Sequence, residues 1–152
     1  MALDATDRQL LSLLQRNAQI TAQELGEVLH LSASQAGRRR QQLEAAGYIN
    51  SIRAVVAADR LGLNVQAFIQ IQMTAHAPEA AQGFASLVHD LDQVTDVWIL
   101  TGEADYLLRV YCTDLAALNR LIQDILLPHP AVARVQSQIV MDQLKRNAPL
   151  PT

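Results

Sequence analysis

The sequence predicts an α+β protein of two domains, a helix-turn-helix followed by a ferredoxin-like βαββαβ domain. Three observations predict this fold class. Two helices with capping-box signals fill residues 21–46 and are separated by a tight turn. From residue 66 onward, strand-like alternation and helix-like spacing follow each other in the order β-α-β-β-α-β. Half of the 152 residues are apolar, which is enough for two small cores.

The chain should begin with two helices. Residues 5–16 carry leucines on one face, and Asp4 precedes them as a plausible N-cap. The second helix opens with Thr21 and Glu24, whose separation is that of a capping box. Both starts are therefore marked by local signals.

The third helix carries the arginines that suggest DNA binding. Ser32 and Gln35 repeat the capping-box spacing at its start, and Gly47 supplies a left-handed residue at its end. Three consecutive arginines occupy positions 38–40. In a helix-turn-helix the second helix of the motif enters the major groove of DNA, and these residues suit that task.

A boundary between the domains is expected near residue 65. Gly62 and Asn64 mark a turn at the end of a short strand and a linker. The expected organisation is a helix-turn-helix DNA-binding domain over 1–50, a linker with a short strand over 51–65, a ferredoxin-like effector-binding and oligomerisation domain over 66–145, and a flexible tail over 146–152.

Strands and helices alternate in the second domain. The expected elements are a strand over 66–75, a helix from 78 to about 90, strands over 94–101 and 106–112, a helix capped by Asp114 and ended by Pro128, and a strand over 132–141. Helices on one side of such a sheet leave its other face open.

The open face should hold an aromatic and amide-rich set of side chains, a composition typical of a partner surface. Its expected members are Phe68, Gln70, Gln72, Trp98, Leu100, Leu107, Arg109, Tyr111, Gln136 and Gln138. We therefore expect two subunits to pack these faces together as a homodimer.

The net charge of −3 is unevenly distributed. Residues 1–65 hold seven arginines and six carboxylates, for a net charge of +1, and residues 66–152 hold five basic and nine acidic residues, for −4. Phosphate contacts need a local positive face rather than a positive protein. The distribution is thus compatible with double-stranded DNA as the partner of the first domain.

Other function classes find little support. The single cysteine, Cys112, excludes an internal disulfide and is expected to be buried and unreactive. His76, His89 and His129 lie far apart, so we expect neither a metal site nor a cofactor. No apolar run is long enough to span a membrane and the start lacks the basic region of a secretory signal, so a cytoplasmic protein is expected.

Candidate DNA contacts cluster at the start of the third helix. Hydroxyl, amide and guanidinium groups can bond base edges and phosphates. The candidates are Ser32, Ser34, Gln35, Arg38, Arg39 and Arg53. The alternative is that the arginines form an ordinary solvated face and that Arg53 is a linker charge.

Candidate effector contacts lie in the turn at 101–105. Backbone N–H groups beside Gly102 suit a carboxylate, and Asp105 could accept from an α-amino group. Thr101 adjoins them. The alternative is a plain β-turn, where Gly and Asp are expected anyway.

The chain resembles the Lrp/AsnC (feast/famine, leucine-responsive) family over nearly its whole length. The resemblance rests on LDATDRQLLSLLQRNAQIT, on LSASQAGRRRQQLEAAGYI and on LTGEADYLLRVYCTD. It implies a winged helix-turn-helix, a ferredoxin-like domain, dimers that often assemble into octamers, and amino-acid effectors. It also implies that Gln136 and Ser137, on the last strand, are weaker effector candidates.

Two positions depart from the family pattern. Arg40 stands where relatives usually carry an apolar residue, on the stripe that should face the core. Its stem could follow the core while its head reaches solvent or a carboxylate. Ala104 replaces an aromatic residue of the effector turn, which implies a roomier or differently selective pocket.

Three function hypotheses follow. The first is a sequence-specific transcription regulator whose second domain oligomerises and senses an amino acid or related small molecule. The second is a small-molecule sensor that acts through protein partners, with weak or lost DNA binding. A ferredoxin-like enzyme, such as a small monooxygenase, would need an acid/base or cofactor group, and the sequence offers none. We therefore expect no enzyme activity.

Overall fold

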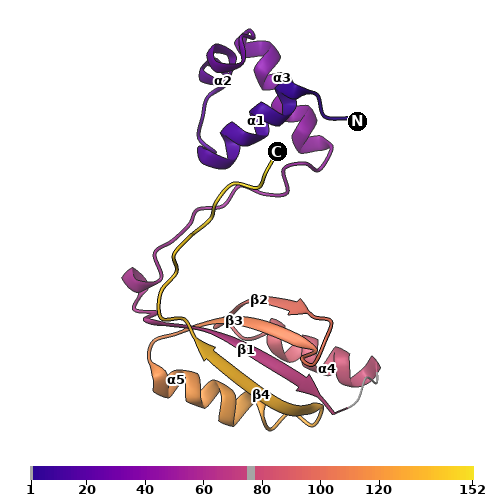
Figure 1. Ribbon diagram of the computed structural model, residues 1–152, viewed down its shortest axis with the longest axis vertical. Coiled ribbons are helices and arrows are strands. Elements are labelled where there is room, and N and C mark those ends of the chain that lie inside the picture. The colour runs from indigo at the N-terminus through magenta and orange to yellow at the C-terminus, as the bar shows by residue number, and fades with distance from the viewer. Residues whose placement is uncertain (1, 75–77) are drawn as a thin grey trace. The chain divides into compact units, whose positions relative to one another are not determined.

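The structure, a computed structural model, describes residues 2–74 and 78–152. It divides into two compact units (Figure 1), one formed by Met1–Val55 with Leu144–Thr152 and the other by Val56–Gln143. The end of the strand expected over 66–75 and His76 lie outside the described residues.

The first unit contains the three expected helices, α1 (Ala5–Arg16), α2 (Ala22–Leu29) and α3 (Ala33–Ala45). Each begins with a complete capping box, which confirms all three predicted starts. In each box the N-cap side chain accepts from a backbone N–H three residues on, and that residue's side chain accepts in return. These local bonds use backbone donors that a helix start leaves unpaired.

The core of this unit and its turn are tightly specified. Leu10, Leu25 and Leu43 are fully buried where the three helices meet. A Cβ at Gly26 would lie 2.7 Å from the carbonyl oxygen of Leu31, so the turn between α2 and α3 closes only on glycine. The crossing of α2 and α3 is therefore fixed by backbone contact as well as by leucine packing.

Residues 51–57, all of which the structure describes, are extended without a paired strand, and a short 3₁₀ turn, η1 (Asp59–Leu61), follows. The short strand expected in the linker does not form, and neither do the paired strands of a wing in this segment. A strand needs a partner strand for its N–H and C=O groups, and among the described residues none pairs with this segment.

The second unit is a four-stranded antiparallel sheet of order β2-β3-β1-β4. The strands are β1 (Val65–Met73), β2 (Val94–Ile99), β3 (Tyr106–Cys112) and β4 (Val132–Ile139). The helices are α4 (Pro78–His89) and α5 (Leu115–Arg120), which continues into a wider turn, η2 (Leu121–Leu126). The order confirms the predicted ferredoxin-like arrangement (Figure 1).

The two helices cover one face of this sheet. Ile69, Ile71 and Leu108 point toward them and are fully buried with Phe84 of α4 and Leu126 of η2. Side chains alternate along a strand, so the residues between them lie on the other face.

That other face has the predicted composition. Phe68 pairs with Arg109 and Gln138 in the neighbouring strands, and Gln70 pairs with Leu107 and Gln136. Trp98 extends the aromatic part of the face onto β2 and is 41% exposed. The structure thus leaves an amide and aromatic surface open on the sheet.

Candidate DNA interface and effector pocket

One face of α3 is exposed and polar. Ser34, Arg38, Gln41 and Gln42 are exposed at helical spacing, on the side opposite the buried Leu43. The two glutamines were not among the residues predicted to contact DNA. Their positions seven and eight residues after Ser34 would have found them, because such residues share a helix face.

The three arginines have different surroundings. Arg39 turns toward the start of α1, where one guanidinium nitrogen donates to Asp4 at 2.8 Å and to Asp7 at 2.6 Å. Asp7 is the buried carboxylate of this unit, with 6% exposure. The guanidinium of Arg39, one of the candidate DNA contacts, therefore lies against α1 instead of on the outer face of α3. Its bonds tie α3 to α1.

These contacts also shift ionisation. The backbone N–H of Asp7, and then the Arg39 side chain, hold the pKa of Asp4 below its ordinary value of 3.8. The same carboxylates, Asp4 first, raise the pKa of Arg39. Because a charged partner favours the charged form, the Asp4 carboxylate and the Arg39 guanidinium stay ionised at neutral pH.

The contacts of Arg40 explain how an arginine can occupy a position that faces the core. Its Nε donates to Glu44 at 3.0 Å and its NH1 to the carbonyl of Ile20 at 3.4 Å. The side chain is 26% exposed. Its stem lies along the domain and its guanidinium head reaches a carboxylate, as expected from the sequence.

The capping box at the start of α3 limits what its residues can offer DNA. The Oε1 of Gln35 accepts from the backbone N–H and the hydroxyl of Ser32, which leaves the two amide donors of Gln35 for an external acceptor. Within the described part of the chain, Ser34 and Arg38 form no side-chain hydrogen bond or ion pair. Arg53 is exposed on the extended segment after α3.

The turn between β2 and β3 is built around Asp105. Its Oδ2 accepts from the backbone N–H of Met73 at 2.7 Å, and its own N–H donates to Ile71. These bonds fasten the turn to β1, a structural role that the sequence could not reveal. Gly102 has a φ of 110° and open space where a side chain would begin, so substituents there are disfavoured by the backbone.

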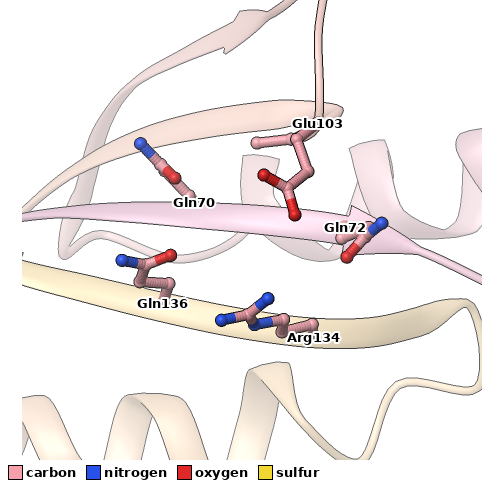
Figure 2. A pocket seen from close by; sticks show the side chains of 6 residues that line it. Gln70, Gln72, Glu103, Arg134 and Gln136 are labelled. Atoms are coloured by element: carbon pink, nitrogen blue, oxygen red, sulfur yellow. The ribbon is translucent and has the colours of Figure 1, made fainter.

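Beside this turn lies a shallow polar pocket on the open face of the sheet. Figure 2 shows Glu103 directed toward β1 and Arg134 extending from β4 along the same depression. The pocket is lined by Gln70, Gln72, Glu103, Ala104, Arg134 and Gln136. Neither Glu103 nor Arg134 forms an ion pair within the described residues.

Of the predicted effector residues, only Gln136 lines this pocket. Ser137 pairs with the buried Ile69 and so lies on the helix side of β4. Thr101 and Gly102 are exposed in the turn itself. Sequence reasoning missed Glu103 and Arg134. The pairing of Gln72 with Arg134 brings the latter there, and only the strand register shows it.

Two remaining expectations concern reactivity and membranes. Cys112 is buried as predicted, with 2% exposure, and this burial raises the pKa of its thiol. Among the helices of the described chain, none combines the length and apolar character needed to cross a bilayer.

The helix-turn-helix with its exposed polar helix, joined to a sheet domain with a polar pocket, defines the class of two-domain DNA-binding regulators. The chain matches the AsnC-type helix-turn-helix domain over residues 3–44 and the Lrp/AsnC ligand binding domain over residues 66–150. The second match alone covers more than half of the chain. This protein belongs to the Lrp/AsnC family of transcription regulators.

Relatives with similar sequences are also transcription regulators. The chain is 30% identical over 149 residues to the DNA-binding transcriptional activator DecR of Escherichia coli (strain K12), with 98% of each chain covered. It is 34% identical over 146 residues to the transcriptional regulatory protein DoeX of Halomonas elongata, with 96% of this chain and 92% of that one covered.

Solved structures extend the similarity to three dimensions. A transcriptional regulator of Neisseria meningitidis, solved as a complex with L-Met, is 37% identical with a TM-score of 0.93, covering 99% of this chain and 97% of that one. AsnC of Escherichia coli is 25% identical with a TM-score of 0.86, over 96% and 97% of the chains.

Proposed function

We propose that this regulator binds specific operator DNA through α3 and that an amino acid bound on the sheet domain changes its affinity for that DNA. The observation that supports DNA binding is the exposed polar face of α3, in which Ser34 and Arg38 have no side-chain partner in the described structure. Groups left unpaired in this way are available to base edges and phosphates.

The six candidate residues then divide by role. Ser34, Gln35 and Arg38 contact bases and adjacent phosphates in the major groove, with Gln35 acting through its amide donors. Ser32 at the helix start and Arg53 after α3 contact the phosphate backbone. Arg39 acts indirectly, because its bonds to Asp4 and Asp7 hold α3 in place.

The proposal that the protein binds an amino acid rests on the pocket beside the β2–β3 turn. An α-amino acid carries a carboxylate and an ammonium, and the pocket offers the guanidinium of Arg134 and the carboxylate of Glu103, which do not neutralise each other. Gln136 also lines the pocket, and Thr101 and Gly102 belong to the adjacent turn. The L-Met complex of the Neisseria meningitidis regulator supports an amino acid as the ligand.

The open sheet face supports a homodimer as the working unit, and further assembly up to an octamer would be built on it. Its aromatic and amide side chains, half-buried on β1 and β3 and exposed on β2 and β4, suit contact with a second copy of the same face. A dimer also presents two copies of α3, which raises the affinity of a weakly basic domain for paired half-sites.

The DNA half is tested by selecting fragments from random duplexes with purified protein and measuring affinity by fluorescence anisotropy. Arg38→Ala should weaken binding by about tenfold and lower its salt dependence, because one cationic contact is lost. Arg120→Ala removes the same charge from α5 and should change neither. Equal affinities for wild type and Arg38→Ala would refute the placement of α3.

If the protein is instead a sensor that does not bind DNA, the opposite result of the DNA selection is expected. This alternative is favoured by the net charge of the chain, which is negative. Under it, no fragment would be enriched above background, although amino acids would still raise the unfolding temperature.

The effector half is tested by thermal shift against the twenty amino acids. One or a few should raise the unfolding temperature of the wild type, and both Glu103→Gln and Arg134→Gln should abolish the shift, since each removes one charge partner. Gln138→Ala, on the same face but outside the pocket, serves as the control. A full shift in both charge variants would place the ligand elsewhere.

A further inference from the structure

The segment after β4, Leu144–Thr152, lies against the helix-turn-helix unit. The backbone N–H of Leu150 donates to Oε1 of Gln15 at 2.6 Å, and Nε2 of Gln15 donates to the carbonyl of Leu150 at 3.2 Å. One carboxamide thus bonds both backbone groups of one residue. A two-point contact of this kind fixes the position and the direction of the segment on α1.

The local sequence prepares this contact. Leu150 stands between Pro149 and Pro151, neither of which has a backbone N–H, so it is the residue of this run that can both donate and accept. The proline that follows also restricts Leu150 to extended backbone. Because the run is stiff before it docks, it loses less conformational entropy on docking than a flexible tail would.

The contact lies at a groove with about 490 Å³ of open space on the helix-turn-helix unit. Its lining includes Leu11 and Leu14 of α1 and Ile52 of the extended segment. Leu150 itself is 74% exposed, so apolar burial contributes little and the polar contact dominates. Exposed hydrogen bonds are weak, and the docking is therefore reversible.

We propose that Leu144–Thr152 is a latch that docks on the chain's own helix-turn-helix through Gln15 and so links that domain to β4. The chain passes between the two units at residues 55–56 and again at residues 143–144. The segment also lines the groove with Arg53, so docking restrains the stretch that carries this DNA-backbone candidate.

The latch gives the effector a route to the DNA-binding unit. β4 carries Arg134 and Gln136 of the effector pocket, and the latch follows this strand in the chain after residues 140–143. A ligand that shifts β4 changes how far the latch can reach, and so the fraction of molecules in which Leu150 is docked. This coupling, unlike the docking, rests on the proposed function of the pocket.

Hydrogen exchange of the full chain tests the docking. Gln15→Leu and a chain ended after Asn147 should both exchange severalfold faster than wild type in residues 11–18 and 48–53, with unchanged helix content because Gln15 is exposed. Gln19→Leu makes the same change on an exposed residue outside the groove and should behave as wild type. Identical exchange in wild type and both latch variants would overturn the proposal.

A mixture separates docking within one chain from docking on a second copy. Chains ended after Asn147 keep a receptive Gln15, and Gln15→Leu chains keep an intact latch. Mixed in equal amounts, they should show no restored protection if each latch docks on its own chain. Protection that returns on mixing would overturn docking within the chain and assign the contact to a partner copy.

The coupling is tested with the amino acid that most raises the unfolding temperature. In wild type it should change DNA affinity, and in Gln15→Leu the ratio of affinities with and without ligand should fall at least twofold toward one. An unchanged ratio would overturn the coupling. If the wild type itself shows no ligand response, the effector part of the proposed function fails, and hydrogen exchange alone decides the latch.

Discussion

Arg39 shows how one side chain can serve stability at a position that suggests DNA contact. Its two bonds join α3 to the first turn of α1, and Asp7 is almost completely buried. A carboxylate left unpaired at such a site is costly, whereas an exposed arginine is replaced with little effect.

We predict that Arg39→Ala lowers the free energy of unfolding by about 1–2 kcal/mol, in the lower part of the usual range because the arginine is 32% exposed. Arg38→Ala should change stability by less than about 0.5 kcal/mol, since it has no partner in the described structure. Urea unfolding followed by circular dichroism measures both. Equal stabilities would show that the ion pairs do not hold the helices.

Acid should also weaken the helix-turn-helix unit. The pKa of Asp4 and that of Glu24 both lie below their ordinary values, Glu24 because the Thr21 backbone N–H donates to it first of all. A carboxylate with a lowered folded pKa adds stability above its unfolded pKa and loses that contribution as pH falls through the folded value. The unfolding temperature should therefore drop below about pH 4.5.

Asp4→Asn keeps an N-cap acceptor but removes the charge that Arg39 pairs with. Its unfolding temperature should fall less steeply than that of the wild type between about pH 4.5 and pH 2.5. Parallel curves for the two proteins would exclude Asp4 as a source of the acid sensitivity.

At the scale of elements, the turn between α2 and α3 is the most demanding feature. Gly26→Ala would place a Cβ against the backbone carbonyl of Leu31, which cannot move aside as a flexible side chain could. The change should lower the free energy of unfolding by about 1–3 kcal/mol. Gly37→Ala is the matched control. There a Cβ meets only the Ala22 methyl at 3.7 Å, and the change should stabilise α3 by about 0.5–1 kcal/mol. Thermal melts compare them, and similar effects of both would contradict the geometry.

The helix starts could be predicted because a capping box is confined to four residues, as at Thr21 and Glu24. The order of strands and helices could be predicted because side chains that alternate along the chain indicate strands, whereas helical spacing of apolar residues indicates helices. The bond from Arg39 to Asp4 spans 35 residues, and no local pattern signals it. For the same reason, the pocket formed by Glu103 and Arg134 and the docking of Leu150 on Gln15 became visible only in three dimensions.

At the scale of the whole molecule, we predict a dimer through the open sheet face. Trp98→Glu should weaken it by more than about tenfold, because a buried unpaired charge opposes contact. Leu115→Glu introduces the same charge at an exposed residue of α5, away from that face, and should leave the dimer intact. Sedimentation velocity resolves the two states. A Trp98→Glu protein that sediments as wild type would exclude this face as the interface.

Ligand binding on the sheet domain should change DNA binding by α3. The most direct measurement is the affinity of wild-type protein for a selected DNA fragment, by anisotropy, across a titration with the amino acid that most raises its unfolding temperature. The affinity should change severalfold and saturate over the ligand range of the thermal shift, and Arg134→Gln should abolish the change. An affinity that stays constant while the ligand saturates the protein would contradict the account.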